Sequence, residues 1–213
     1  MPLAGELISG ASMEGQHFLA ESVYKTDLAQ LKPFLLPQGR RAFCGPATSA
    51  AVINAALRPS NPVTQFSLFG TATPDTKSEL AVSLSGLTLE ELAVLLRAHG
   101  LVVRTVHAKF GDVATFRADA QETLSEPLTF LVVNYDRGAV EQAGAGHISP
   151  VGAYHVATDR LLVMDVAAYK YLHTWVPLSK LWVAMNTVDL DSGRSRGYLI
   201  VTAGARVDGT SGR

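Results

Sequence analysis

The chain contains a single cysteine, Cys44, in a position that favours nucleophilic chemistry. A helix is predicted over Cys44 to Leu57, because Pro46 is tolerated in a first helical turn and Arg58, which precedes a proline, ends the apolar pattern. A thiol at a helix N-terminus feels the positive end of the backbone dipole, which favours the thiolate. Six residues upstream, the side-chain amide of Gln38 would hold a developing oxyanion together with the Cys44 backbone N–H. The alternative is a small buried hydrophobe, as for most unpaired cysteines.

A histidine and an aspartate in the second half of the chain supply the groups that such a thiol needs. His147 follows Gly144-Ala145-Gly146 in a loop that enters a predicted strand, and Asp165 ends a later strand, Leu161 to Val166. A predicted hairpin turn at residues 157–160 would place the two strands side by side, so that Asp165 fixes the tautomer of His147. The other histidines are expected to be structural: His17, His99, His107, His155 and His173.

The elements expected around these residues change type along the chain. The first half is mostly helical and the second half mostly extended. Further helices are predicted at Thr88 to Gly100, Asp112 to Leu124 and Leu178 to Met185. Further strands are predicted at Leu101 to Val106, Leu128 to Tyr135, Ile148 to Val156 and Tyr198 to Thr202. This order predicts an α+β fold in which a helical N-terminal lobe carries the cysteine and an antiparallel sheet carries the histidine and aspartate, as in papain-like enzymes.

Length and composition narrow the class of protein. The chain has 213 residues, which predicts one domain over residues 1–213, with residues 1–15 and 205–213 as loose ends. Lys plus Arg total 18 and Asp plus Glu total 19, a balance that argues against a nucleic-acid partner or an anionic membrane surface. One cysteine allows no internal disulfide and no zinc site built from several thiolates. No signal peptide or membrane span is visible, so a cytoplasmic location is expected, and a periplasmic one stays open if a leader was removed.

Several short motifs, in order, resemble one family of enzymes. The sequence from about residue 25 to residue 203 is similar to the catalytic domain of phytochelatin synthases. The motifs that carry the resemblance are Cys44-Gly45-Pro46-Ala47-Thr48, Ser85-Gly86-Leu87-Thr88-Leu89-Glu90-Glu91-Leu92, Val133-Asn134-Tyr135, Gly146-His147-Ile148-Ser149-Pro150, Met164-Asp165-Val166, Tyr169-Lys170-Tyr171, Trp175-Val176-Pro177 and Leu181-Trp182 with Ala184-Met185-Asn186-Thr187.

The resemblance implies a papain-like glutathione γ-glutamylcysteinyltransferase. In this family the cysteine attacks the Cys–Gly bond of glutathione, glycine leaves, and a γ-glutamylcysteinyl thioester passes to a second glutathione. The products bind soft metals, and Cd or Zn enters as the metal–thiolate complex of glutathione or as an activator, with no covalently bound cofactor and no metal site of the protein's own. The implied partners are glutathione and metal–glutathione complexes, and a homodimer is left open.

The resemblance also assigns roles to single residues. Cys44 matches the nucleophile, His147 the general acid and base, Asp165 the orienting acid and Gln38 the oxyanion-hole glutamine. Three more residues match positions that line the acyl-enzyme pocket, namely Asn134, Arg137 and Arg196. The two arginines also suit the free carboxylates of glutathione, which a guanidinium can bind through two hydrogen bonds.

The chain departs from the family pattern near the predicted aspartate. Ala168 stands where the family usually has an arginine, Leu172-His173 where it often has two prolines, and Thr48 where it tends to have serine. No Cys-rich C-terminal extension follows. We therefore expect substantial hydrolysis of the thioester to γ-Glu-Cys, with some transfer to glutathione retained.

Two other classes of function compete with this interpretation. Papain-like leader peptidases of bacteriocin exporters share the glutamine followed by Cys-Gly. Cleavage of a double-glycine leader peptide, without use of glutathione, would favour that class. A non-catalytic module that binds soft metals is a third class, although one cysteine and scattered histidines make a poor site for them.

Overall fold

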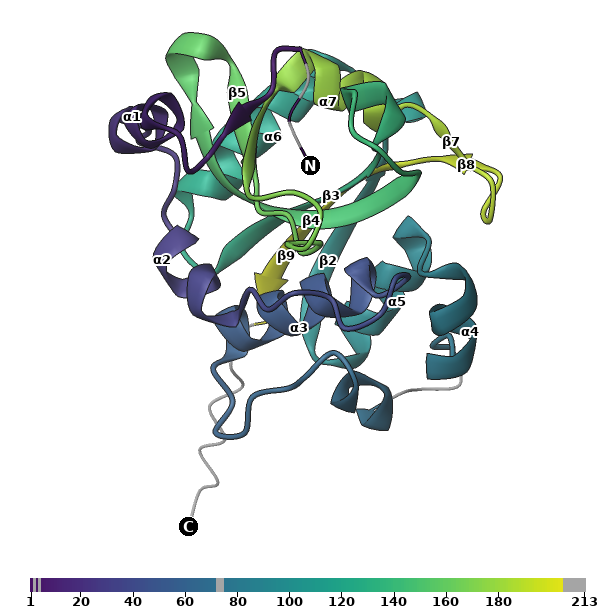
Figure 1. Cartoon of the computed structure of the whole chain (residues 1–213). Helices are drawn as coiled ribbons and strands as arrows, with labels where there is room; N and C mark the ends of the chain where they lie inside the picture. The colour runs from purple at the N-terminus through teal and green to yellow at the C-terminus, as the bar shows by residue number, and fades with distance from the viewer. Residues whose placement is uncertain (2, 4, 72–74, 205–213) are drawn as a thin grey trace.

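The structure, a computed structural model, describes residues 1, 3, 5–71 and 75–204, and it confirms the predicted α+β class. Within these residues, seven strands form one antiparallel sheet in the order β1-β6-β5-β4-β3-β9-β2 (Figure 1). The helices are α1 (Met13–Glu21), α2 (Leu28–Leu31), α3 (Cys44–Leu57), α4 (Glu79–Ser85), α5 (Leu89–Ala98), α6 (Val113–Ser125) and α7 (Leu178–Met185). The strands are β1 (Ile8–Ser9), β2 (Leu101–His107), β3 (Thr129–Asp136), β4 (Gly146–His155), β5 (Arg160–Val163), β6 (Thr174–Pro177), β7 (Val188–Asp189), β8 (Arg194–Ser195) and β9 (Gly197–Ala203).

Helices cover both faces of the sheet. Buried side chains of α3 and α5 form one hydrophobic core with residues of β2, β3 and β9, such as Val103, Val132 and Leu199. Side chains of α6 and α7 form a second core with alternate residues of the same strands, such as Val133 and Tyr198. Figure 1 shows α3 and α5 below the sheet and α6 and α7 above it. The alternation follows from the two-residue period of a strand, which sends successive side chains to opposite faces.

The helices predicted around the cysteine and near the C-terminus have the predicted bounds, Cys44–Leu57 and Leu178–Met185. The helix predicted from Thr88 runs from Leu89 to Ala98, with the expected capping box between Thr88 and Glu91. The strand predicted over Leu161 to Val166 is shorter. It ends at Val163, so Asp165 lies in the segment after β5 rather than within the strand.

The prediction that residues 1–15 are a loose end is wrong for residues 8–15. Ile8 pairs with Trp175 of β6, and α1 begins at Met13 behind an N-cap, Ser12, whose hydroxyl accepts from Gly15 N–H. The indole of Trp175 also donates to the carbonyl oxygen of Gly15 at 2.9 Å. The partners of this segment lie more than 150 residues away along the chain, so its Gly- and Ser-rich composition could not reveal them. The predicted loose end at residues 205–213 lies outside the described residues.

The last strand of the sheet joins its two halves. β9 pairs with β3 on one side and with β2 on the other, both antiparallel. β2 follows α5 and packs with the helices around α3, whereas β3 continues to β4 and β5. β9 therefore ties the helical part that carries Cys44 to the strands that carry His147. Within the part of the chain described here, no helix is long and apolar enough to cross a membrane.

Candidate active site

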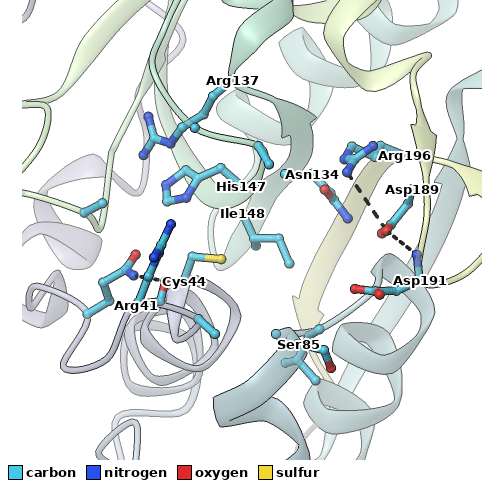
Figure 2. Close-up of a pocket in the computed structure, with 18 of the residues that line it drawn as sticks. Arg41, Cys44, Ser85, Asn134, Arg137, His147, Ile148, Asp189, Asp191 and Arg196 are labelled. Atoms are coloured by element: carbon cyan, nitrogen blue, oxygen red, sulfur yellow. Dashed lines mark hydrogen bonds and ion pairs between the residues drawn. The ribbon is translucent and has the colours of Figure 1, made fainter.

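A pocket of about 550 Å³ lies where α3 meets β4, and it contains Cys44 and His147. Figure 2 shows Cys44 in the middle, with His147 above it, Arg41 on one side and Asn134, Asp189, Asp191 and Arg196 on the other. The pocket volume falls in the range of sites for small molecules, roughly 300–1,000 Å³. The predicted nucleophile and base therefore meet in a cavity that would admit a small peptide.

Cys44 is the first residue of α3, as predicted, and the first turn of this helix has no acidic residue. Burial alone would raise the pKa of the thiol. A hydrogen bond and charge interaction with His147, together with the backbone amides of Ile148 and Gly45, outweigh burial and lower the pKa of Cys44 below its ordinary value. Pro46 has no N–H, so the backbone amides of this first turn that can face the sulfur are those of Cys44 and Gly45. The surroundings of the sulfur thus favour the thiolate.

His147 lies between the thiol and Asp165. Its Nε2 atom is 3.0 Å from Asp165 Oδ1 and 3.0 Å from Ser149 Oγ, which leaves Nδ1 to face Cys44. Burial would lower the pKa of His147, but the hydrogen bonds and charges of Asp165 and Cys44 raise it above the ordinary value. The predicted order of nucleophile, base and orienting acid is therefore present in space. The sequence analysis quoted Ser149 within a motif but gave its hydroxyl no role.

Asp165 has a second partner that the sequence did not reveal. Nη2 of Arg137 lies 2.9 Å from Oδ1 and 2.7 Å from Oδ2 of this carboxylate, and both side chains are buried. Burial would raise the pKa of Asp165, but His147 and Arg137, with the Ala167 N–H, lower it below its usual range. Arg137 also lines the pocket. Its charge is paired with that of Asp165, which favours a role in positioning this carboxylate, and the predicted role in binding a substrate carboxylate stays a prediction.

Asn134 and Arg196 line the pocket, as predicted, and they lie together at one end of it. In the sheet, Asn134 pairs with Ile148 of β4 and with Gly197 of β9, so it lies between His147 and Arg196 along the register. The Arg196 guanidinium donates to Val188 O and Thr187 Oγ1, and its buried Nε has no hydrogen-bond partner. A buried cationic N–H without an acceptor is costly, which favours an anionic ligand there.

Gly146 makes room for this arginine. A Cβ atom on Gly146 would lie 2.8 Å from Nη2 of Arg196, closer than such contacts allow. The glycine before the predicted base therefore lets the backbone of β4 approach the guanidinium. The segment Gly144-Ala145-Gly146, which precedes the buried His147, therefore also leaves room for Arg196.

Two carboxylates at the same end were missed by the sequence analysis. Asp189 ends β7 and its Oδ1 lies 4.0 Å from Nη2 of Arg196, and the same carboxylate accepts from the Asp191 N–H at 3.2 Å. Both aspartates line the pocket, and Asp191 is exposed. In the sequence the two residues stand in an acidic turn before Gly193, which resembles an ordinary solvated loop. We call Asn134, Asp189, Asp191 and Arg196 the hairpin end of the pocket.

Gln38 lines the pocket, but both hydrogens of its amide are bound to backbone carbonyl oxygens. Nε2 donates to the carbonyl oxygens of Arg40 and Arg41 at 2.9 and 2.8 Å, which uses both hydrogens, and the buried Oε1 has no partner. In this conformation the amide has no free N–H for an oxyanion. The oxyanion role of Gln38 stays a prediction, whereas the Cys44 backbone N–H lies beside the sulfur.

His155, one of the histidines expected to be structural, lies outside the pocket. His155 is buried, bonds through Nε2 to Glu21 and through Nδ1 to Thr158, and stacks on Phe18. It is not among the residues that line the pocket. Across the described residues, no three His, Cys, Asp or Glu side chains gather in a way that could hold a metal ion.

Comparison with known proteins identifies the family. The sequence model of the family described as phytochelatin synthase matches residues 1–198. The chain belongs to the phytochelatin synthase family. Its membership agrees with the resemblance drawn from the motifs around Cys44, His147 and Asp165.

Curated relatives carry the name of one transferase. The chain is 34% identical to glutathione gamma-glutamylcysteinyltransferase 3 of Lotus japonicus over 92% of this chain and 42% of that protein. It is also 34% identical to glutathione gamma-glutamylcysteinyltransferase 1 of Triticum aestivum, over 90% of this chain and 40% of that protein. The chain thus spans about two fifths of the length of these phytochelatin synthase relatives.

Among solved structures, the chain is similar to the peptidase domain of Streptococcus ComA, described as a bi-functional ABC transporter involved in a quorum-sensing pathway. The two are 15% identical, with a TM-score of 0.48, over 79% of this chain and 97% of that one.

Proposed function

We propose that the chain is a cysteine-dependent acyltransferase that takes the γ-Glu-Cys group from glutathione. The observation that carries the proposal is the hairpin end, where Arg196 and two aspartates lie in the same pocket as Cys44 and His147. The γ-glutamyl group of glutathione ends in an α-ammonium and an α-carboxylate. A guanidinium with an unpaired Nε suits the carboxylate, and the carboxylates of Asp189 and Asp191 suit the ammonium.

The first step follows from the geometry beside the thiol. Sγ of Cys44 attacks the carbonyl carbon of the cysteinyl unit, and the C–N bond to glycine breaks. His147, charged in the pair, gives its proton to the departing glycine nitrogen, and a γ-Glu-Cys thioester remains on Cys44. Asp165, held by Arg137, keeps the imidazole turned with Nε2 away from the thiol and stabilises its positive charge.

The second step decides the product. An uncharged amino group of a second glutathione, or a water molecule, attacks the thioester carbonyl while the now neutral His147 takes the proton and the Cys44 thiolate leaves. Transfer to glutathione gives a peptide with two γ-Glu-Cys units, and transfer to water gives γ-Glu-Cys. Cd or Zn takes part as a component of the substrate, bound to the thiolate of glutathione.

Mass spectrometry of the protein incubated with glutathione, with and without Cd, tests the proposal. We expect glycine together with γ-Glu-Cys, and the two-unit peptide in an amount that rises with Cd. Cys44→Ala is the matched control and should release no glycine, because the chain has no other thiol. Absence of glycine release by the wild-type protein, with Cys44 still open to alkylation, would contradict the proposal. Cleavage of a double-glycine leader peptide under those conditions would then assign the chain to the leader-peptidase class.

A further inference from the structure

The hydroxyl of Ser149 contacts the imidazole of His147, yet no step of the proposed reaction uses it. Ser149 follows His147 by two residues in β4, so the two-residue period of a strand sends both side chains to the same face of the sheet. Its Oγ atom lies 3.0 Å from Nε2 of His147. Ser149 is 0% exposed, so bulk solvent does not compete for this contact.

The same oxygen also contacts the segment that carries the aspartate. The N–H of Val166, the residue after Asp165, donates to Ser149 Oγ at 3.4 Å. The carbonyl oxygen of Val166 accepts from the Gln38 N–H at 2.9 Å, so both backbone polar groups of Val166 are bound. Ser149 therefore links the strand of the base to the segment of the orienting acid.

The ionisation of Asp165 decides the direction of the hydrogen bond between Ser149 and His147. Burial would raise the pKa of Asp165, but its hydrogen bonds and charge interactions lower it, so the carboxylate is ionised and can only accept. Nε2 of His147, at 3.0 Å from Asp165 Oδ1, therefore carries a proton. Beside this N–H the hydroxyl oxygen of Ser149 is an acceptor, so the two oxygens share one Nε2–H.

The opposite direction of this hydrogen bond would stop the reaction. If the hydroxyl donated to Nε2, a neutral imidazole would carry its proton on Nδ1, the atom that faces Cys44. Such a ring could not take a proton from the thiol, from an incoming amine or from water. An acceptor beside Nε2 thus favours the tautomer that the proposed reaction needs.

We infer that Ser149 is a positioning residue that acts through His147. Its oxygen is the second acceptor of Nε2–H, which keeps the imidazole in the productive tautomer and stabilises the imidazolium beside the Cys44 thiolate. The effect of Ser149 on turnover rests on the proposed function, whereas its effect on the pair of Cys44 and His147 needs no substrate.

The described residues that titrate or carry charge around this imidazole stay in place when Ser149 is changed. They are Cys44 at the start of α3, Tyr135 of β3, whose ring is edge-on with 5.8 Å between centroids, Asp165, and Arg137, which is paired with Asp165. A change in the pair after substitution of Ser149 therefore reports the hydroxyl itself.

Alkylation of Cys44 by iodoacetamide, followed from about pH 4 to pH 10, measures the pair directly because the chain has no other cysteine. In Ser149→Ala we expect the midpoint to rise by about 0.5–1 pH unit, since the imidazolium that stabilises the thiolate loses one of its two acceptors. Glycine release from glutathione at pH 7 should fall about three- to tenfold, the factor that corresponds to this shift. An unshifted midpoint in a variant that circular dichroism shows to be folded would overturn the inference.

Two further variants separate this role from a merely structural one. Ser149→Thr keeps the hydroxyl and should return the midpoint toward the wild-type value. Ser22→Ala removes another buried serine hydroxyl, which donates to Phe18 O at 2.7 Å outside the pocket, and should leave the midpoint unchanged. A midpoint in Ser149→Thr as high as in Ser149→Ala would overturn the inference, as would an equal shift in Ser22→Ala.

NMR of the protein labelled with ¹⁵N-histidine tests the tautomer without a substitution of Ser149. The neutral imidazole of His147, observed at high pH with Cys44 alkylated, should carry its proton on Nε2, and His147→Ala identifies its signals. A proton on Nδ1 would overturn the inference. A midpoint that rises in Ser149→Ala, in a protein whose wild type releases no glycine, would support the role of Ser149 in the pair and contradict the proposed function alone.

Discussion

Two parts of the pocket wall are built differently. At the hairpin end, Asn134 and Arg196 are 2% and 8% exposed; Asn134 lies in β3 and Arg196 directly precedes β9, and of this set Asp191 is exposed. Elsewhere on the wall of the pocket, Arg41 is exposed and Tyr169 is 68% exposed, and both lie outside strands and helices. Buried and sheet-bound groups are preorganised for one ligand, whereas exposed loop residues contribute weaker and more adjustable contacts. Under the proposed function, the acyl group would be held by buried groups in or next to the sheet, whereas the incoming amine or water would meet more exposed side chains of loops.

A change at His147, which acts on the reacting bond itself, should have the largest effect. His147→Ala is expected to lower glycine release about 10²–10⁴-fold, since it removes the proton donor for the leaving amine. The same variant should raise the pKa of the Cys44 thiol, because His147 supplies the contacts that lower it. Alkylation by iodoacetamide, followed from pH 5 to pH 10, measures this shift as a midpoint that moves to higher pH.

His155→Ala is the matched control for that experiment. It removes a buried histidine that bonds to Glu21 and Thr158 outside the pocket. The alkylation midpoint should stay at the wild-type value. A larger loss of turnover in His155→Ala than in His147→Ala would reassign the base.

Removing Arg137 should destabilise the structure around Asp165 without changing the hairpin end of the pocket. Arg137→Met leaves the buried carboxylate of Asp165 with one partner fewer, which is expected to cost about 3–5 kcal/mol of the free energy of unfolding at pH 7. The pKa of Asp165 is lower in the folded state than in the unfolded state. The ionised carboxylate therefore stabilises the folded state at pH values above its unfolded-state pKa, and this contribution is lost as pH falls through its folded-state pKa. Urea unfolding at pH 7 and near pH 3 measures both effects, and the variant should lose less stability on acidification than wild type.

Arg104→Met is the control for this measurement. Arg104 forms an ion pair with Asp119 at 2.7 Å but is 52% exposed, so its removal should cost less than about 1 kcal/mol. Equal unfolding free energies for the two variants would argue against a positioning role for Arg137.

A change confined to the hairpin end should weaken substrate binding alone. Arg196→Met is expected to lower kcat/KM for glutathione by about 10–150-fold, the value of one buried charged hydrogen bond of about 1.5–3 kcal/mol. The rate of Cys44 alkylation should stay nearly unchanged, because Arg196 is not among the groups that shift the pKa of the thiol. Arg194→Met, an exposed neighbour paired with Glu90 at 3.6 Å, is the control. A parallel collapse of alkylation would show that Arg196 is a structural residue.

The smallest effect is expected at Gln38. Its two amide hydrogens are bound to backbone carbonyls, so Gln38→Ala should lower kcat less than about tenfold, compared with about 10²–10³ for a true oxyanion donor. Steady-state release of glycine measures the difference. Circular dichroism checks that the variant is still folded despite the change in the loop of residues 38–43. A loss of kcat near 10²–10³-fold would support the oxyanion role of Gln38 and would mean that its amide turns during the reaction.

Local signals explain what the sequence could predict. The helix from Cys44 to Leu57 has its stop before Pro59, and the capping box at Thr88 is a short-range pattern, so both elements follow from neighbouring residues. His147 and Asp165 could be paired because a single hairpin joins the strand of His147 to β5, which ends two residues before Asp165.

The remaining features depend on partners far away in the chain. The first strand pairs with β6, and Arg137 reaches Asp165, although nothing near either residue signals the other. The carboxylates of Asp189 and Asp191 look like a solvated turn until β9 brings Arg196 beside them. Long-range pairing of this kind is set by tertiary structure, which a local pattern does not encode.

The place of β9 in the sheet has a consequence for the order in which the protein matures. Among the described residues this strand is the last in sequence, yet it lies between β3 and β2, where Leu101 pairs with Ala203. Contacts between residues so far apart in the sequence form late in folding, because the entropy cost of closing the long loop comes before the stabilisation by the contacts. A chain that ends before Gly197 should therefore keep Cys44 at the reactivity of an ordinary thiol, which alkylation of such a truncated chain would measure. During synthesis, the nucleophile would then stay unactivated until nearly the whole sheet has been made.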